Sequence, residues 1–153
     1  MSNTGFWIIV LVAVFMFGSF MSVRISPREK ALGEMRDRAR KLGFLPRLMA
    51  APEWIKHKTN SGKPGGMVAY YSVVLPQSMH PLMQARVVDG RLKVENGASV
   101  LQDVVLDTRL KGIQALEIQS NSAGFYWDEA VDLHGDQLEV MKSVLSDFAE
   151  QLK

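Results

Sequence analysis

The pattern of apolar and polar residues divides the chain into an uncharged apolar run, a basic amphipathic segment and a longer region of short alternating segments. The run from Gly5 to Val23, GFWIIVLVAVFMFGSFMSV, contains nineteen residues without a charge. A helix rises about 1.5 Å per residue, so this run reaches roughly the thickness of a bilayer's hydrocarbon core. Because backbone amides in lipid must be paired within their own segment, we expect a transmembrane helix over residues 5–23, after a short external N-terminus at residues 1–4.

Two other interpretations of this run compete with a membrane anchor. A cleavable signal peptide needs a basic first region and a small-residue cleavage site, whereas Ser2-Asn3-Thr4 carries no positive charge and Gly18 to Ser22 fits a cleavage site poorly. A buried core helix is the second alternative, but uncharged runs of this length are rare inside soluble domains. We therefore favour an uncleaved anchor.

The next segment has a helical period. Ser26-Pro27-Arg28-Glu29 has the pattern of a capping box, with Pro at the first helical position and Glu three residues after the Ser. Apolar residues then recur at three- and four-residue steps, at Ala31, Leu32, Met35, Ala39 and Leu42. Gly43 is placed to end the helix in a left-handed conformation. These features predict a basic juxtamembrane amphipathic helix within residues 24–43.

The basic side of this predicted helix is a candidate membrane-surface site. Its members are Arg24, Arg28, Arg36, Arg40 and Lys41. They can adsorb to anionic lipid headgroups, at about 1 kcal/mol per basic residue held near the surface. Alternatively, the apolar stripe packs on the following domain while the basic side chains face solvent. The two interpretations are compatible with each other.

Short β-branched and aromatic segments follow from residue 44. They predict strands at 44–49, 67–75, 82–88, 91–95, 104–107, 113–119 and 123–128. Pro46 restricts the first of these to an edge or an irregular start, and Asp89-Gly90 is the strongest hairpin signal in the chain. The segment 56–66, KHKTNSGKPGG, has the composition of a loop.

The last segment again has a helical period. Its apolar positions are Leu138, Met141, Leu145, Phe148 and Leu152, after an opening at Gly135-Asp136. We expect this helix to cover one side of the sheet. The fold class is therefore α+β, with a domain at residues 44–153 that contains an antiparallel sheet of about five to seven strands and a C-terminal helix. The order of elements from Phe44 to Lys153 resembles the pleckstrin-homology-like architecture, and a plainer sheet with helices on one face is the alternative.

Charge is distributed unevenly along the chain. Between Arg24 and Lys63 there are eleven Lys or Arg and four acids, a net charge of +7, and residues 64–153 carry a net charge of −5. Because no charged side chain precedes the apolar run, the positive-inside rule places the basic flank and the folded domain in the cytoplasm and the N-terminus outside. The basic residues are not interleaved with aromatic residues, so the pattern does not favour a nucleic-acid partner.

The sequence offers few candidates for chemistry. It has no cysteine, and its three histidines, His57, His80 and His134, are isolated from one another. The acidic residues Asp128, Glu129, Asp132 and Asp136 lack a calcium-loop pattern and suit the positive end of the last helix instead. We therefore expect an inert module, with no catalytic residue, cofactor or metal site. Trp54, Tyr126 and Trp127 are candidate contacts for a protein partner, since strand alternation would leave Tyr126 exposed beside acids.

The whole chain resembles the small single-pass inner-membrane proteins of gram-negative bacteria, which combine an N-terminal span, a Ser-Pro-Arg-Glu basic helix and a small domain. The span followed by Arg and Pro is also similar to the YajC-type accessory subunit of the protein-translocation machinery, whose Gly-Asp-x-Val-x-Thr-x-Gly-Gly segment is missing here. We expect a non-enzymatic accessory or scaffold protein of a larger membrane assembly, with membrane lipid and a membrane protein as partners. A module that binds anionic lipid through the basic helix is the alternative.

Overall fold

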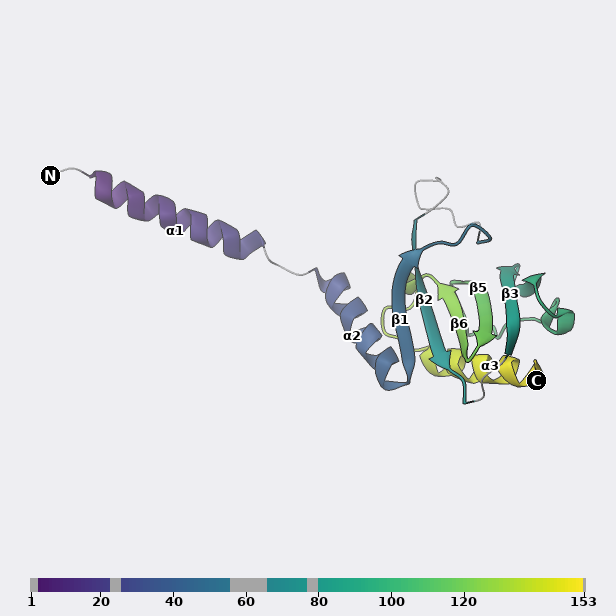
Figure 1. The fold of residues 1–153 in the computed structure, drawn as a ribbon. Helices are drawn as coiled ribbons and strands as arrows, with labels where there is room; N and C mark the ends of the chain where they lie inside the picture. Colours follow the sequence, from purple (N-terminus) through teal and green to yellow (C-terminus); the bar gives the residue numbers. More distant parts are fainter. Residues whose placement is uncertain (1–2, 23–25, 56–65, 77–79, 153) are drawn as a thin grey trace. The chain divides into compact units, whose positions relative to one another are not determined.

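The computed structural model of the chain describes residues 3–22, 26–55, 66–76 and 80–152 (Figure 1). The chain forms two compact units, residues 1–30 and residues 31–153. Residues 56–65 of the predicted loop at 56–66 and the basic residue Arg24 lie outside the described residues.

Helix α1, Thr4–Ser22, is apolar on all sides. Its exposed apolar side chains include the consecutive residues Phe6 to Ile9, and the Phe15 side chain is 75% exposed. Within the described parts of the chain, no helix combines the length and the apolar character that are needed to cross a membrane. The prediction of a transmembrane helix over 5–23 is therefore not confirmed. At about 1.5 Å per residue, α1 is roughly 28 Å long, slightly shorter than a hydrocarbon core of about 30 Å.

Helix α2, Pro27–Lys41, begins and ends as its sequence predicts. The Ser26 hydroxyl accepts a hydrogen bond from the Glu29 amide at 3.2 Å, and the Glu29 carboxylate accepts one from the Ser26 amide at 3.3 Å. This reciprocal pair is the capping box. Gly43 has φ +90°, a left-handed conformation that ends the helix.

Six antiparallel strands form one sheet in the order β1-β2-β6-β5-β3-β4. The strands are β1 Phe44–Ala50, β2 Met67–Val74, β3 His80–Val88, β4 Arg91–Asn96, β5 Ile113–Ser120 and β6 Ser122–Trp127. Two short 3-10 turns, η1 at Ser99–Leu101 and η2 at Glu129–Val131, precede the C-terminal helix α3, Leu138–Gln151. Strand β1 stands at one edge of the sheet, as Pro46 predicts. Asp89 and Gly90 both have positive φ, 50° and 75°, as a two-residue hairpin turn requires.

Two predictions about the sheet were wrong. Residues 104–107 do not form a strand, because Val105 makes only an isolated bridge to Arg91 and the segment runs as a loop along β4. The pleckstrin-homology-like barrel is not found either. Within the described residues β1 and β4 are the two ends of an open sheet and do not pair with each other. The plainer α+β alternative is the observed architecture.

The main core lies on one face of the sheet. Figure 1 shows α3 running across the strands on this side. Helix α3 contributes the buried residues Leu138, Met141 and Leu145, which pack in one cluster with Phe125 of β6 and Met35 of α2. A smaller cluster on the opposite face consists of Ile55, Val68, Tyr70, Ala115 and Tyr126. Strand alternation divides the two clusters, since neighbouring residues of one strand point to opposite faces.

Candidate functional site

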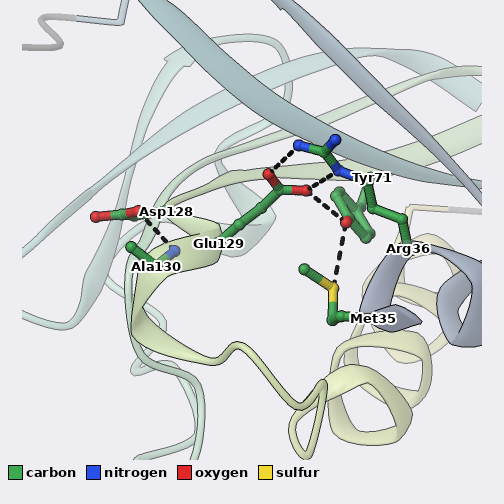
Figure 2. A network of polar contacts seen from close by, with 6 residues as sticks. All are labelled: Met35, Arg36, Tyr71, Asp128, Glu129 and Ala130. Atoms are coloured by element: carbon green, nitrogen blue, oxygen red, sulfur yellow. Dashed lines mark hydrogen bonds and ion pairs between the residues drawn. The ribbon is translucent and has the colours of Figure 1, made fainter. Parts of the chain in front are cut away.

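A buried polar network joins α2 to the sheet and to η2 (Figure 2). The Arg36 guanidinium donates from Nε to Glu129 Oε1 at 2.8 Å and from Nη2 to Glu129 Oε2 at 2.5 Å. The Tyr71 hydroxyl donates to Glu129 Oε1 at 2.6 Å and lies 3.3 Å from the Met35 sulfur. Three segments that are distant in the sequence therefore meet at one carboxylate.

Local structure positions each member of this network. Glu129 opens η2 directly after β6, and the Asp128 carboxylate caps that turn by accepting a hydrogen bond from the Ala130 amide at 2.9 Å. Tyr71 lies on the core face of β2, where its ring meets Trp127 edge-on at a centroid distance of 5.2 Å. Arg36 directly follows Met35, a buried residue of α2. The guanidinium therefore reaches Glu129 from the margin of the main core.

The electrostatics of this network favour a structural role. Glu129 is only 8% exposed, and both of its oxygens accept hydrogen bonds. The hydrogen bond to Glu129 raises the pKa of Arg36 further above its already high ordinary value. Burial, followed by the hydrogen bond to Glu129, raises the pKa of Tyr71 well above its usual range. A carboxylate engaged in this way is poorly placed to act as a base, so we assign the network to holding α2 against the domain.

Two further contacts hold the same helix. Arg38 donates from Nη1 to the His134 carbonyl at 3.2 Å. Lys142 of α3 donates from Nζ to the Leu42 carbonyl at 2.8 Å, at the C-terminal end of α2 where carbonyl groups lack helical partners. Residues 31–42 are therefore bound to both ends of the segment 129–142.

The predicted membrane-surface residues have different surroundings. Arg36 belongs to the Glu129 network, and Arg40 donates to Asp37 at 2.6 Å on the same helix. Arg28, in the first unit, and Lys41 are exposed. The structure therefore separates Arg36 from the surface-exposed basic residues of α2.

The expectation that Tyr126 is exposed to a partner was wrong. Tyr126 is 2% exposed and Trp127 is 1% exposed. Trp127 lies in the main core, while Tyr126 points to the opposite face as alternation predicts. There the half-buried Trp54 meets the Tyr126 ring edge-on at 5.7 Å. The segment 51–55 therefore covers Tyr126, which strand alternation alone could not reveal.

A second polar cluster, on the face opposite α3, was missed in the sequence. The Tyr126 hydroxyl donates to Glu117 Oε2 at 2.7 Å, and Gln84 Nε2 donates to Glu117 Oε1 at 2.9 Å. The Tyr70 ring lies 4.5 Å from the Tyr126 ring. Burial raises the pKa of Tyr70 to about 12, and burial also raises the pKa of Tyr126 well above its usual range. In the sequence, Gln84, Glu117 and Tyr126 are only polar positions on three separate predicted strands. The pairing of those strands, which brings the three side chains together, is decided by the tertiary structure.

The acidic residues near the last helix have local structural partners. Asp132 accepts hydrogen bonds from the amides of Gly135 and Gln137, both at 2.9 Å, just before α3 begins. Asp132 therefore lies at the positive end of the helix as predicted, whereas Asp128 caps η2 and Glu129 binds Arg36. Within the described residues no group of His, Asp and Glu side chains is arranged to hold a metal ion. Of the histidines, His134 is exposed, His80 begins β3 and His57 lies outside the described residues.

Comparison with protein families, curated proteins and solved structures finds no match to this chain.

Proposed function

We propose that this protein is a non-enzymatic accessory or scaffold protein that is held at the bacterial inner membrane through α1 and presents residues 31–153 to a larger membrane protein assembly. The observation that carries this proposal is the exposure of α1. Its consecutive apolar side chains point in all directions, and its described residues carry no charge. Such a helix is expected in an apolar environment rather than in water.

Charge supports an orientation for the anchored protein. The basic segment that begins at Arg24 follows α1. Basic residues are retained on the cytoplasmic side of bacterial membranes. We therefore place the N-terminus outside and the α+β unit in the cytoplasm.

The contacts of α2 favour an accessory role over the alternative of a lipid-binding module. A lipid phosphate would have to compete with Glu129 for Arg36, with the His134 carbonyl for Arg38 and with Asp37 for Arg40. The buried Met35 and Ala39 occupy the apolar side of the same helix. Arg28 and Lys41 remain the best candidates for contact with anionic headgroups.

Membrane attachment is tested by alkaline carbonate extraction of cell membranes that contain the full chain. We expect the native chain to remain in the membrane pellet and the double variant Leu11→Lys/Phe15→Lys to be released, because each Lys costs about 3 kcal/mol within a bilayer. The matched control is Val74→Lys/Val105→Lys, which places the same charges on exposed apolar positions of the second unit. Release of the native chain by carbonate would overturn the proposal.

Orientation and partnership need separate measurements. Protease added to sealed spheroplasts should leave the C-terminal part intact, and its digestion would reverse the proposed orientation. After solubilisation in mild detergent, we expect the chain to migrate with other membrane polypeptides. A particle that contains only copies of this chain would contradict the accessory role and leave the membrane attachment standing.

A further inference from the structure

Exposed apolar side chains of the second unit gather along β1. We call the exposed residues Leu45, Leu48 and Met49 of this strand, together with Met67 of β2, the β1 patch. Leu48 is 53% exposed, and Met67, which pairs with Ala50 of β1, is 58% exposed. Among the described residues of this unit, the other large exposed apolar side chains are spread over β2, β3, both 3-10 turns and the loop at residue 105. Clustered exposed apolar residues mark a surface that contacts another molecule or a membrane.

Basic side chains accompany the β1 patch. Arg47 lies between Leu45 and Met49 on one face of β1, and Lys41 ends α2 just before the strand. Both basic side chains are exposed, and among the described residues neither forms an ion pair. The sequence from 38 to 51 has four bases and no acid. The β1 patch is therefore an apolar surface in a cationic setting.

Charge is divided across the sheet. Strands β1 and β2, at one end of the sheet, contain Arg47 and no acidic residue (Figure 1). Residues 89–153, which supply β4, β5, β6 and α3, have twelve acids and six bases, a net charge of −6. The exposed side of α3 includes Glu139 and Asp147. An anionic surface therefore attracts the β1 end of the unit and repels the exposed side of α3, which selects one orientation.

We propose that the β1 patch, with Arg47 and Lys41, rests on the anionic headgroup layer of the membrane and places its apolar side chains at the acyl boundary. This inference rests on the proposed function, in which α1 holds the chain at a bilayer. Lipid phosphates attract the two cations, and the acyl boundary accepts leucine and methionine side chains, so one ligand suits both features. A nucleic acid would offer phosphates but no apolar layer for Leu48 and Met67.

This surface differs from the basic side of α2 that the sequence predicts. Arg36 and Arg40 of α2 pair with carboxylates of the protein itself. Arg47 was not among the predicted membrane-surface residues, and only its place in the sheet sets it between the exposed Leu45 and Met49. The lipid contact is therefore assigned to the strand rather than to the helix.

Quenching of a fluorophore by labelled lipid tests this contact in the full chain. The native sequence has no cysteine, so Leu48→Cys and the control Val105→Cys each take one NBD label, at similarly exposed positions. Val105 bridges to Arg91 of β4, at the far edge of the sheet. In vesicles of phosphatidylcholine and phosphatidylglycerol, we expect doxyl-labelled lipid to quench the Leu48 label several-fold more than the Val105 label. The difference should fall in phosphatidylcholine alone and at high salt.

Charge reversal tests the attraction to anionic lipid directly. Lys41→Glu/Arg47→Glu in the Leu48→Cys chain should reduce quenching several-fold in the mixed vesicles. The matched control, Arg91→Glu/Lys111→Glu, makes the same change of net charge at exposed positions outside β1 and β2, and it should leave quenching unchanged. Circular dichroism of each variant checks that the fold is retained.

Equal quenching of the Leu48 and Val105 labels, or quenching that does not depend on phosphatidylglycerol, would overturn the inference. A Leu48 label whose emission shows shielding from water without quenching by lipid would also overturn it, because protein, from this chain or another, then covers the patch. Carbonate extraction of the same vesicles tests α1 separately. Retention of the chain without Leu48 quenching removes only this inference, and Leu48 quenching without retention removes only the anchor.

Discussion

Arg36 of α2 and Glu129 of η2 form a two-point ion pair, with both guanidinium-to-carboxylate distances at or below 2.8 Å. The pair joins residues 93 positions apart in the sequence. It holds α2 against the turn η2 that follows β6.

Removing the charge of Glu129 should destabilise the second unit. Glu129→Gln leaves the Arg36 cation and the buried Tyr71 hydroxyl with weaker acceptors, so we expect the free energy of unfolding to fall by about 2 kcal/mol, allowing for the partial exposure of Arg36. The matched control is Glu95→Gln, which removes the more exposed partner of Arg86 and should cost less than about 1 kcal/mol. Urea unfolding of the full chain in detergent, followed by tryptophan fluorescence, measures both. Equal losses for the two variants would contradict the special role of the Glu129 network.

The three tyrosines predict loss of stability at alkaline pH. The pKa of Tyr70 is raised to about 12, and those of Tyr71 and Tyr126 are raised as well, mainly by burial. A raised folded-state pKa contributes stability that is complete below the unfolded pKa of about 10 and is lost as the pH rises above it. Each tyrosine should therefore lower the free energy of unfolding as the pH rises from about 10 to its folded-state pKa, which is about 12 for Tyr70.

Ultraviolet difference absorbance of tyrosinate checks this pH dependence. We expect tyrosinate to form together with unfolding in one cooperative transition, and Tyr70→Phe to make the loss of stability with pH less steep. Independent titration near pH 10 with the fold intact would show that the tyrosines are accessible to solvent.

Gly124 leaves room for the Tyr70 ring. A Cβ atom at Gly124 would lie 2.6 Å from Tyr70 Cε2, so Gly124→Ala must displace a ring that is packed on Tyr126. We expect a loss of about 1–3 kcal/mol in the free energy of unfolding. Gly33→Ala is the control, because a Cβ there meets nothing within 4 Å in the middle of α2 and should stabilise the helix by about 0.5–1 kcal/mol. Thermal unfolding monitored by circular dichroism would rank the variants, and an unchanged Gly124→Ala would contradict the close packing.

Two glycines with positive φ should differ in their tolerance of a side chain. Gly97 has φ +104°, and a Cβ there would lie 2.4 Å from the Leu82 carbonyl oxygen. Gly90 has φ +75°, and a Cβ there has open space. Gly90→Ala should cost about 1–2 kcal/mol for the left-handed conformation alone, whereas Gly97→Ala should cost about 3 kcal/mol or more because backbone must also move. Urea midpoints at constant m-value would reveal the difference, and similar midpoints would show that β3 yields easily at Leu82.

Most of the local elements were predictable from neighbouring residues. The capping box at Ser26 and Glu29, the hairpin turn at Asp89-Gly90 and the edge position of Pro46 each depend on groups within a few positions of one another. Each of these features is decided within a short segment, so the sequence pattern was sufficient to predict it. Residues 104–107 were mistaken for a strand because their composition suits one, although the chain uses them to pair irregularly with β4.

The candidate site was not predictable in this way. Arg36 was expected on a solvated or lipid-facing surface, and only the packing of Met35 into the core brings it to Glu129. Likewise, alternation gave the correct face for Tyr126 but not its burial, which depends on Trp54 in the segment that crosses that face.

The sequence by itself determined the uncharged apolar segment, the polarity of its flanks and the start and end of α2, because composition and near-neighbour hydrogen bonds decide these features. Only the tertiary structure decided that the sheet is open with β4 as its second edge, that Glu129 binds α2 and that the loop after η1 bonds to β4. These features depend on strand register and on contacts between residues that are distant in the sequence. Such contacts form, and contribute to stability, only when the chain folds.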